Sequence, residues 1–484
     1  MFQDTAPSCL LVASLCELGE RLSQLELFVA EPSVRARAEN EGLIVALLAA
    51  VDHLVQRLDR QVIAPLRKPL QDGSLEDQAC AQALEEVQRF ALAFQKAHQN
   101  LAFLTGHGSH AVTYTFVHKL LNEARTKALP APDICLGNEY DFFRHDLRKT
   151  LVAPLEALGT ASRLPEWGLS LLLPKAEAGN PLMWTMLAHQ IGHYIVDHFK
   201  VAHHIRADLP IRTGTSPQSD DALLRYAEEL AADLLAQRLA GPAYFLSLAS
   251  LGLLFRPGGP LGLGVPLGLR LGHLRRHLKP LEALDGQGLR RTANVELFSS
   301  LDALSLAERL VSECHRLSAP SEPSGLSSSE QDPSVALENY DCLDAIIARQ
   351  RVAPAAIPSP EDFHALFARM CSGIPINSLC PTLSRETIKR LEGAATPTEF
   401  YHLLGDIRER PTTLAHILLV GWTYKLLRSY QIFRELLLSA ATLREALAAY
   451  AGHLRNRQAL LQKSIETSFI QQTYNRWRGE AHGA

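Results

Sequence analysis

The chain has 484 residues, enough for two to four domains, and 47% of them are apolar, which predicts a sizeable core. Its formal net charge of −4 at pH 7 gives no argument for nucleic-acid binding. No apolar run approaches the ~20 residues that a membrane helix requires, and acidic residues interrupt the N-terminus, so neither a membrane span nor a signal peptide is expected. The eight cysteines show no CxxC pair, which favours free thiols and a cytoplasmic protein.

The N-terminal quarter of the chain has apolar residues at i, i+3 and i+4 spacing, which predicts a helical bundle over residues 1–125. We expect helices over Cys9–Leu27, Val34–Leu66 and Ser74–Leu104, separated by prolines at positions 32, 65 and 69 and a glycine at 73. Low aromatic content and abundant Leu and Ala favour helices throughout, so the predicted fold class is mainly α with a small β element.

The best strand candidate is Gly168–Pro174, a short apolar run bounded by glycine and proline. Two interpretations stay open. It is either a buried strand or helix fragment, or an edge strand that binds a peptide backbone by strand addition.

The most informative segment follows, the five residues HQIGH at His189–His193. Two histidines four residues apart lie on one face of a helix, so both imidazoles can reach one metal ion. Apolar residues on both sides of the segment would place the pair in a partly dry environment. A second pair with the same spacing, His273 and His277, has two arginines between its histidines and no acid nearby, so we expect a solvated or capping role there.

An acidic helix is predicted next, from the N-cap residues at 219–220 to the glycine and proline at 241–242. Glu229 and Asp233 form an acidic i,i+4 pair, which is mildly unfavourable in an isolated helix. A metal ion with its histidine ligands would turn that repulsion into attraction. Ala232 and Ala236 share the same side of the helix, so a bulky neighbour can approach.

Together, the HQIGH segment and the E-x-x-A-D element at 229–233 resemble gluzincin metallopeptidases similar to the HtpX and CAAX-protease group. The resemblance implies that His189, His193 and Glu229 are ligands of Zn²⁺ and that Asp233 orients a ligand histidine from the second shell. It implies a zincin-like metallopeptidase core, flanked by N- and C-terminal helical domains.

The resemblance covers roughly residues 165–280 and is loose outside the two motifs. PLGLRL at 266–271 is a weak echo of a P-L-x-x-R-I segment that follows the core in those proteases, but Gly264 and Val265 stand where a histidine precedes it. The metzincin pattern fails, because Phe199 stands where its third histidine is required and Val196 replaces its glycine.

Gln190 stands where zincins have the glutamate that serves as general base. An amide has nearly the shape of a carboxylate but cannot take a proton from water, and losing a general base typically costs ~10²–10⁴-fold in rate. One hypothesis is a Glu→Gln change made in an active peptidase, which we favour because every other element of the site is present. The alternative is a natural pseudoprotease that serves as a helical protein-binding module.

We therefore expect a soluble zinc-dependent metallopeptidase, inactive in this form, with a protein or peptide substrate and a regulatory partner protein, but neither nucleic acid nor a membrane as partner. A third hypothesis, a helical adaptor in which the motif is accidental, predicts no metal. His198, His203 and His204 crowd the end of the metal helix and are expected at the surface. The Gly/Pro-rich stretch at 257–268 lacks a phosphate-loop lysine, so nucleotide binding is not predicted.

The remaining chain divides at a Ser/Pro-rich segment, residues 317–337, which is predicted to be a flexible linker. It separates a core at 126–316 from a C-terminal helical domain at 338–484, where we expect helices over Leu414–Leu438 and Leu443–Arg478. Two E-x-x-H pairs, at positions 361/364 and 399/402, also occur in di-iron bundles. Helix capping explains Glu399 without iron, and the partner glutamates on two further helices are not evident, so we expect Glu361/His364 and Glu399/His402 to bind no iron.

Overall fold

A computed structural model of the chain describes helices and a small sheet. The described residues are 6–29, 51–52, 54–72, 74–105, 111–123, 133–137, 142–146, 169–198, 200, 204, 217–254, 267–275, 347, 352, 354–355, 358, 360–376 and 412–482. Most of them are helical, which confirms the expected mainly α class. None of the helices among them has the length and apolarity needed to cross a membrane.

The described part of the N-terminal region is helical, as the apolar spacing predicted, and the first half of the helix predicted over Val34–Leu66 lies outside the described residues. Its helices are α1 (Ala6–Val29), α4 (Ala64–Asp72), α5 (Asp77–Thr105) and α6 (Ala111–Glu123). The prediction that Pro65 and Pro69 separate helices was wrong, because both lie within α4. A π-helical turn, η1 (Asp59–Ile63), directly precedes α4. Such a turn shifts the regular hydrogen-bond ladder just before Pro65, a place where a residue without an N–H is tolerated.

The sheet has three strands in the order β1-β3-β2, formed by Asp133–Gly137, Leu169–Pro174 and Phe143–Asp146, respectively. The predicted strand at 168–174 is confirmed as β3, and of the two interpretations left open for it, the buried strand is the correct one. β1 pairs with it in parallel and β2 antiparallel, so β3 is central. Leu171 and Leu173 of β3 are fully buried, which explains its apolar character.

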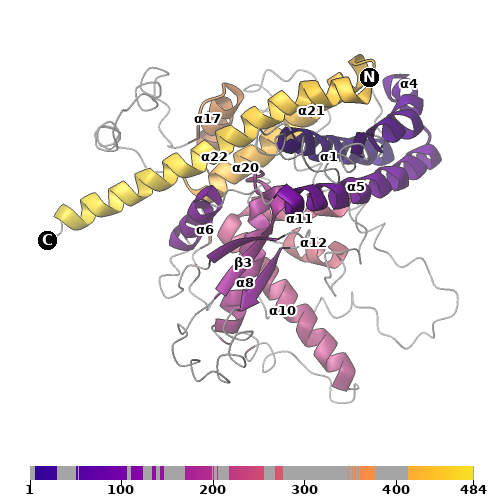
Figure 1. Ribbon diagram of the computed structural model, residues 1–484. Helices are drawn as coiled ribbons and strands as arrows, with labels where there is room; N and C mark the ends of the chain where they lie inside the picture. The colour runs from indigo at the N-terminus through magenta and orange to yellow at the C-terminus, as the bar shows by residue number, and fades with distance from the viewer. Residues whose placement is uncertain are drawn as a thin grey trace.

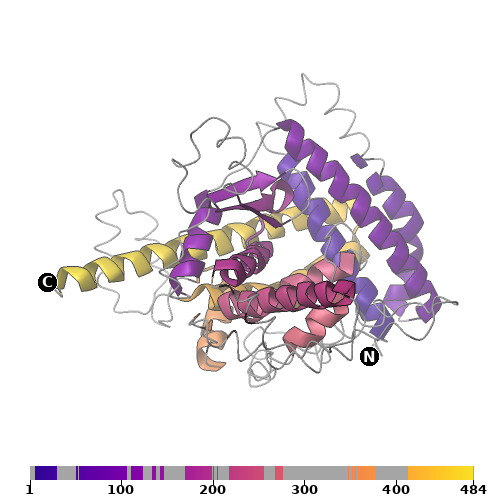
Figure 2. The same cartoon turned by 90° about the horizontal axis from the view of Figure 1, so that it is seen from below.

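The middle of the chain continues from β3 through two 3₁₀ turns, η3 (Lys175–Glu177) and η4 (Met183–Thr185), into α8 (Met186–His198). The helices after it are α10 (Pro217–Ala240), α11 (Pro242–Leu254) and α12 (Leu267–Arg275). α8 packs against α10, α11, α6 and the sheet, and Figure 2 shows it between the sheet and α10. A helix that is covered on most sides must be apolar around most of its circumference, as α8 is.

The junction of α10 and α11 is a turn at Gly241, which has a φ of +66°. Its N–H donates to the carbonyl of Gln237 (2.8 Å), the single bond of an αL helix stop. Pro242 then opens α11, because a proline at the first helical position loses no hydrogen bond. The predicted end of the acidic helix at Gly241-Pro242 is confirmed.

The C-terminal region consists of α17 (Pro360–Cys371), α20 (Leu414–Tyr424), a π turn η7 (Lys425–Ser429), α21 (Tyr430–Ser439) and α22 (Leu443–His482). The two helical stretches predicted after residue 412 are confirmed, apart from the π turn. α22 has 40 residues, so it is about 60 Å long. Figure 1 shows it crossing the molecule beside α20, α21 and α1 and ending well beyond them at the C-terminus.

Helices from the two ends of the chain are joined by a buried group of charges, the α1–α22 ion cluster (Glu17, Glu20, Lys425 and Arg457). Each of the four side chains is at most 2% exposed. Lys425 Nζ lies 2.6 Å from Glu17 Oε1 and 3.3 Å from Glu20 Oε2, and the Arg457 guanidinium pairs with both oxygens of Glu20. Two acids thus face two bases, so the cluster places no net charge in the core.

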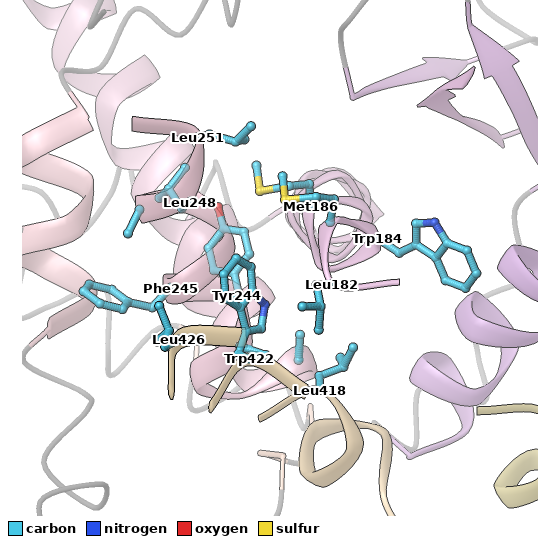
Figure 3. Packing of buried hydrophobic residues seen from close by; sticks show 14 of the residues in the cluster. Leu182, Trp184, Met186, Tyr244, Phe245, Leu248, Leu251, Leu418, Trp422 and Leu426 are labelled. Carbon is cyan, nitrogen blue, oxygen red and sulfur yellow. The ribbon is translucent and has the colours of Figure 1, made fainter. Parts of the chain in front are cut away.

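One continuous cluster of buried apolar side chains runs from α1 through α8, α10 and α11 to α22. Figure 3 shows part of it, where Leu182 and Met186 meet Tyr244 and Leu248 of α11 and Trp422 of α20. The predicted domain boundaries near residues 125, 316 and 337, and the predicted linker, lie outside the described residues.

Candidate metal centre

The segment that leads into α8 is fixed by buried polar contacts. The carboxylate of Glu177 is fully buried, accepts from Asn180 Nδ2 (2.9 Å), and pairs with Arg21 of α1. The backbone carbonyl of the same residue accepts from Trp184 Nε1 (2.9 Å). These bonds anchor the start of α8 to the N-terminal helix and determine the direction in which α8 leaves the sheet.

α8 places the two predicted histidine ligands one turn apart. His189 Nε2 and His193 Nε2 are 3.1 Å from each other, although both are basic nitrogens. The two side chains differ in exposure, at 2% for His189 and 21% for His193. One imidazole is therefore embedded in the protein, and the other borders the accessible side of the site.

Glu229 of α10 supplies a carboxylate opposite this pair. Its Oε1 lies 3.2 Å from His193 Nε2, and its Oε2 lies 3.4 Å from His189 Nε2. Oε2 is buried and has no hydrogen-bond partner among the described residues. A buried carboxylate oxygen without a donor is costly unless a cation satisfies it, so this atom indicates a place for a metal ion.

The separations between the three donor groups are small enough for one metal ion. With metal–ligand bonds of ~2.0–2.1 Å, two ligands of a tetrahedral ion lie about 3.3 Å apart. The two histidine nitrogens are 3.1 Å apart, and they lie 3.2 and 3.4 Å from different oxygens of Glu229. His189, His193 and Glu229 thus form a group that could hold a metal ion, and two imidazoles with one carboxylate suit a transition metal or zinc better than Ca²⁺ or Mg²⁺.

Gly192 allows the two ligand-bearing helices to come this close. A Cβ atom on Gly192 would lie 2.5 Å from the backbone oxygen of Ala232 and 3.0 Å from its Cα. The backbone of α10 therefore occupies the space that a side chain at position 192 would need, so only glycine fits there. Since Ala232 lies between Glu229 and Asp233, this crossing brings both acids to the level of the histidines.

Asp233 lies on the side of His189 that faces away from Glu229. His189 Nδ1 is 2.8 Å from Asp233 Oδ1. A carboxylate can only accept, so the imidazole donates from Nδ1, and its Nε2 faces Glu229. Arg270 of α12 pairs with both oxygens of Asp233, and the hydroxyl of Tyr244 in α11 donates to Oδ1 (2.5 Å).

The charges of the site favour ionised acids at neutral pH. Burial raises the pKa of Glu229, but the imidazoles of His189 and His193 outweigh it and hold that pKa well below its ordinary value. Burial also raises the pKa of Asp233, and the Arg270 guanidinium outweighs it in the same way. For His189 the burial effect lowers the pKa, whereas the two carboxylates raise it by more. The site therefore offers carboxylates, not carboxylic acids, to a cation.

Gln190 directly follows His189 in the sequence of α8, and its side chain is buried. Its amide can donate and accept hydrogen bonds but cannot serve as a base. The predicted site residues thus all lie on two neighbouring helices, α8 and α10.

Two of the other histidine predictions fall on described side chains. His204 is exposed, as expected. The solvated or capping role expected for His273 was wrong, because its side chain is buried where α12 packs against α10 and α11. The side chains of His198, His203 and His277, and those of both E-x-x-H pairs, lie outside the described residues.

Sequence reasoning missed three residues that shape the site. Gly192 is inside the motif, but nothing in the sequence shows how close α10 comes to it. Arg270 lies in the PLGLRL segment, where the pattern gave it no role. Tyr244 carries no local signal except its place just after the Gly241-Pro242 turn.

Comparison of the chain with models of known protein families, with curated proteins and with solved structures found no match.

Proposed function

We propose that this chain is a zinc metallopeptidase of the gluzincin type, in which Gln190 at the general-base position makes the given form inactive. The observation that supports it most strongly is the convergence of His189, His193 and Glu229 on one place, with Asp233 behind the first of them. Zn²⁺ bound by such residues lowers the pKa of a water ligand and polarises a peptide carbonyl.

Each residue of the site has a role in this proposal. His189, His193 and Glu229 hold the metal, and Asp233 keeps His189 in the tautomer whose Nε2 is available as a ligand. His193 and Glu229 are both about one-fifth exposed, whereas His189 is enclosed, so a peptide approaches from the side of His193. Gln190 can orient a water molecule or a carbonyl group by hydrogen bonding, but it cannot accept the proton.

The first test is the metal content of the full-length chain, purified without chelators and measured by elemental analysis. We expect about one zinc per chain and its loss in the His193→Ala variant. His204→Ala is a matched control, because that histidine is exposed and lies outside the ligand group. Absence of metal from the unsubstituted chain would overturn the proposal, and stoichiometric iron in place of zinc would overturn the peptidase assignment.

The second test restores the base. Gln190→Glu, loaded with zinc, is incubated with a mixed peptide library, and new termini are identified by mass spectrometry. The double variant Gln190→Glu with His193→Ala controls for contaminating proteases. Cleavage by the single variant that disappears in the double variant supports a peptidase.

The identity of residue 190 itself favours a second candidate, a pseudoprotease whose site binds a partner without cleaving it. This candidate predicts zinc in the unsubstituted chain but no cleavage by Gln190→Glu. The same two measurements therefore separate the two functions.

A further inference from the structure

We propose that Tyr244 is a positioning residue of the metal centre, which fixes Asp233 and through it the imidazole of His189. The inference rests on the proposed function, because it concerns how tightly that site holds its metal. It assigns a role to a residue in α11, outside the two helices that carry the ligands.

The contacts of Asp233 show how its carboxylate is held. Oδ1 accepts from the Tyr244 hydroxyl (2.5 Å), from Arg270 Nη2 (2.5 Å) and from His189 Nδ1 (2.8 Å). Oδ2 accepts from Arg270 Nε (2.7 Å). With donors on both oxygens, the plane of the carboxylate has one orientation, and the ring that donates to it has one direction.

The Tyr244 hydroxyl occupies a bridging place among these groups. It donates to Asp233, and it accepts from Arg270 Nη2 at 3.1 Å. Its removal therefore leaves the acid and the guanidinium each one hydrogen bond short. Asp233, Tyr244 and Arg270 are fully buried, so water does not replace the missing bond.

The ring of Tyr244 also lies parallel to the imidazole that it helps to orient. The centroids of Tyr244 and His189 are 6.2 Å apart, with an interplanar angle of 4°. The turn at Gly241 brings this ring to the site, since it folds α11 back so that Tyr244 reaches Asp233, eleven residues earlier in α10. The position of a ligand in α8 thus depends on a side chain beyond the end of α10.

The experiment compares Tyr244→Phe, which removes only the hydroxyl, with Tyr430→Phe as a matched control. Tyr430 is also buried and donates to a buried carboxylate, that of Glu17, but it lies in α21, in contact with the α1–α22 ion cluster. Zinc affinity of the full-length chains is measured by competition with a chromophoric chelator. The visible spectrum of the Co²⁺-loaded chains is recorded as well, because it reports ligand geometry, which a purely structural role would not change.

We expect Tyr244→Phe to weaken zinc binding by about 10-fold, the lower end of the effect of losing an outer-shell partner because Asp233 itself stays in place, and to change the Co²⁺ spectrum. Tyr430→Phe should leave both unchanged. Because Tyr244→Phe could fail to fold, Arg270→Lys is measured in parallel. It keeps the charge but loses the two-pronged contact with Asp233 and Tyr244, so it should weaken zinc binding as well.

The outcomes separate this inference from the proposed function. If the unsubstituted chain binds zinc and His193→Ala abolishes binding, but Tyr244→Phe keeps full affinity and an unchanged spectrum, the positioning role is wrong while the metal site stands. Equal losses in Tyr244→Phe and Tyr430→Phe would also overturn it, because the effect would then follow stability. Failure of the unsubstituted chain to bind zinc overturns both.

Discussion

Gly192→Ala should disable metal binding without removing any ligand. The added Cβ would lie 2.5 Å from the backbone oxygen of Ala232, whereas carbon–oxygen contacts are normally about 3.3 Å or longer. The helices α8 and α10 must therefore separate locally by about 0.8 Å. Metal–ligand distances tolerate only about 0.2 Å, so Glu229 would no longer reach an ion held by the two histidines.

The same separation affects the support behind the ligands. A displacement of about 0.8 Å stretches the 2.8 Å contact between His189 and Asp233 to about 3.6 Å, beyond hydrogen-bond range. We expect zinc affinity to fall by more than the about 10- to 100-fold that follows loss of an outer-shell partner alone. Overpacking should also destabilise the chain by about 1–3 kcal/mol.

The assay is a competition titration with a chromophoric chelator, with circular dichroism to show that the variant is folded. Gly452→Ala in α22 is the matched control, since a Cβ there meets nothing within 4 Å. Alanine in an open helical position should stabilise the chain by about 0.5–1 kcal/mol and leave zinc binding unchanged. A folded Gly192→Ala chain with full zinc affinity would refute the role assigned to this helix crossing.

Three further substitutions test contacts that stabilise the fold outside the metal centre. Burial raises the pKa of Glu20, but Arg457 and Lys425 outweigh it and hold that pKa at about 2. Ionised Glu20 therefore contributes about 3 kcal/mol to the free energy of unfolding above pH 4.5, and this contribution is lost as the pH falls towards 2. The difference in urea midpoint between the unsubstituted chain and Glu20→Gln should be constant above pH 5 and shrink below about pH 4.5, and a pH-independent difference would contradict this. Gly241→Ala should cost about 1–2 kcal/mol, because φ there is +66°, and an unchanged melting temperature would refute the assignment of a strained turn. Arg21→Met removes the cation that pairs with the buried carboxylate of Glu177. Thermal denaturation should therefore show a loss of about 3–5 kcal/mol in the free energy of unfolding, and a loss below 1 kcal/mol would mean that the pair contributes little.

Local patterns in the sequence predicted the helices that carry the site. The stop signal of α10 and the spacing of the two histidines in α8 depend on neighbouring residues alone, so they are visible without a structure, whereas α10 begins at Pro217, before the N-cap residues predicted at 219–220. The grouping of His189, His193 and Glu229 was expected from the resemblance to gluzincins, not from spacing alone, and the structure brings the three side chains together.

The parts that sequence did not reveal depend on contacts between distant residues. β1 and β2 are short and acquire their strand character by pairing with β3, so no local signal marks them. The approach of α10 to Gly192 depends on helix packing, and the contact of Tyr244 with Asp233 depends on the angle of one turn. His273 was misjudged for the same reason, since its neighbours in sequence are charged while its neighbours in space are α10 and α11.

The α1–α22 ion cluster has a consequence for the order in which the protein can fold during synthesis. Glu20 and its partner Arg457 are separated by 437 residues. At about 5–20 residues per second, a ribosome needs about 20–90 s to make the second after the first. For nearly all of that interval the acids of α1 lack both cations of the cluster, because Lys425 is also made late, so α1 stays hydrated at that surface. The first helix of the chain is therefore among the last to be packed, and α22 completes the fold that the N-terminus begins.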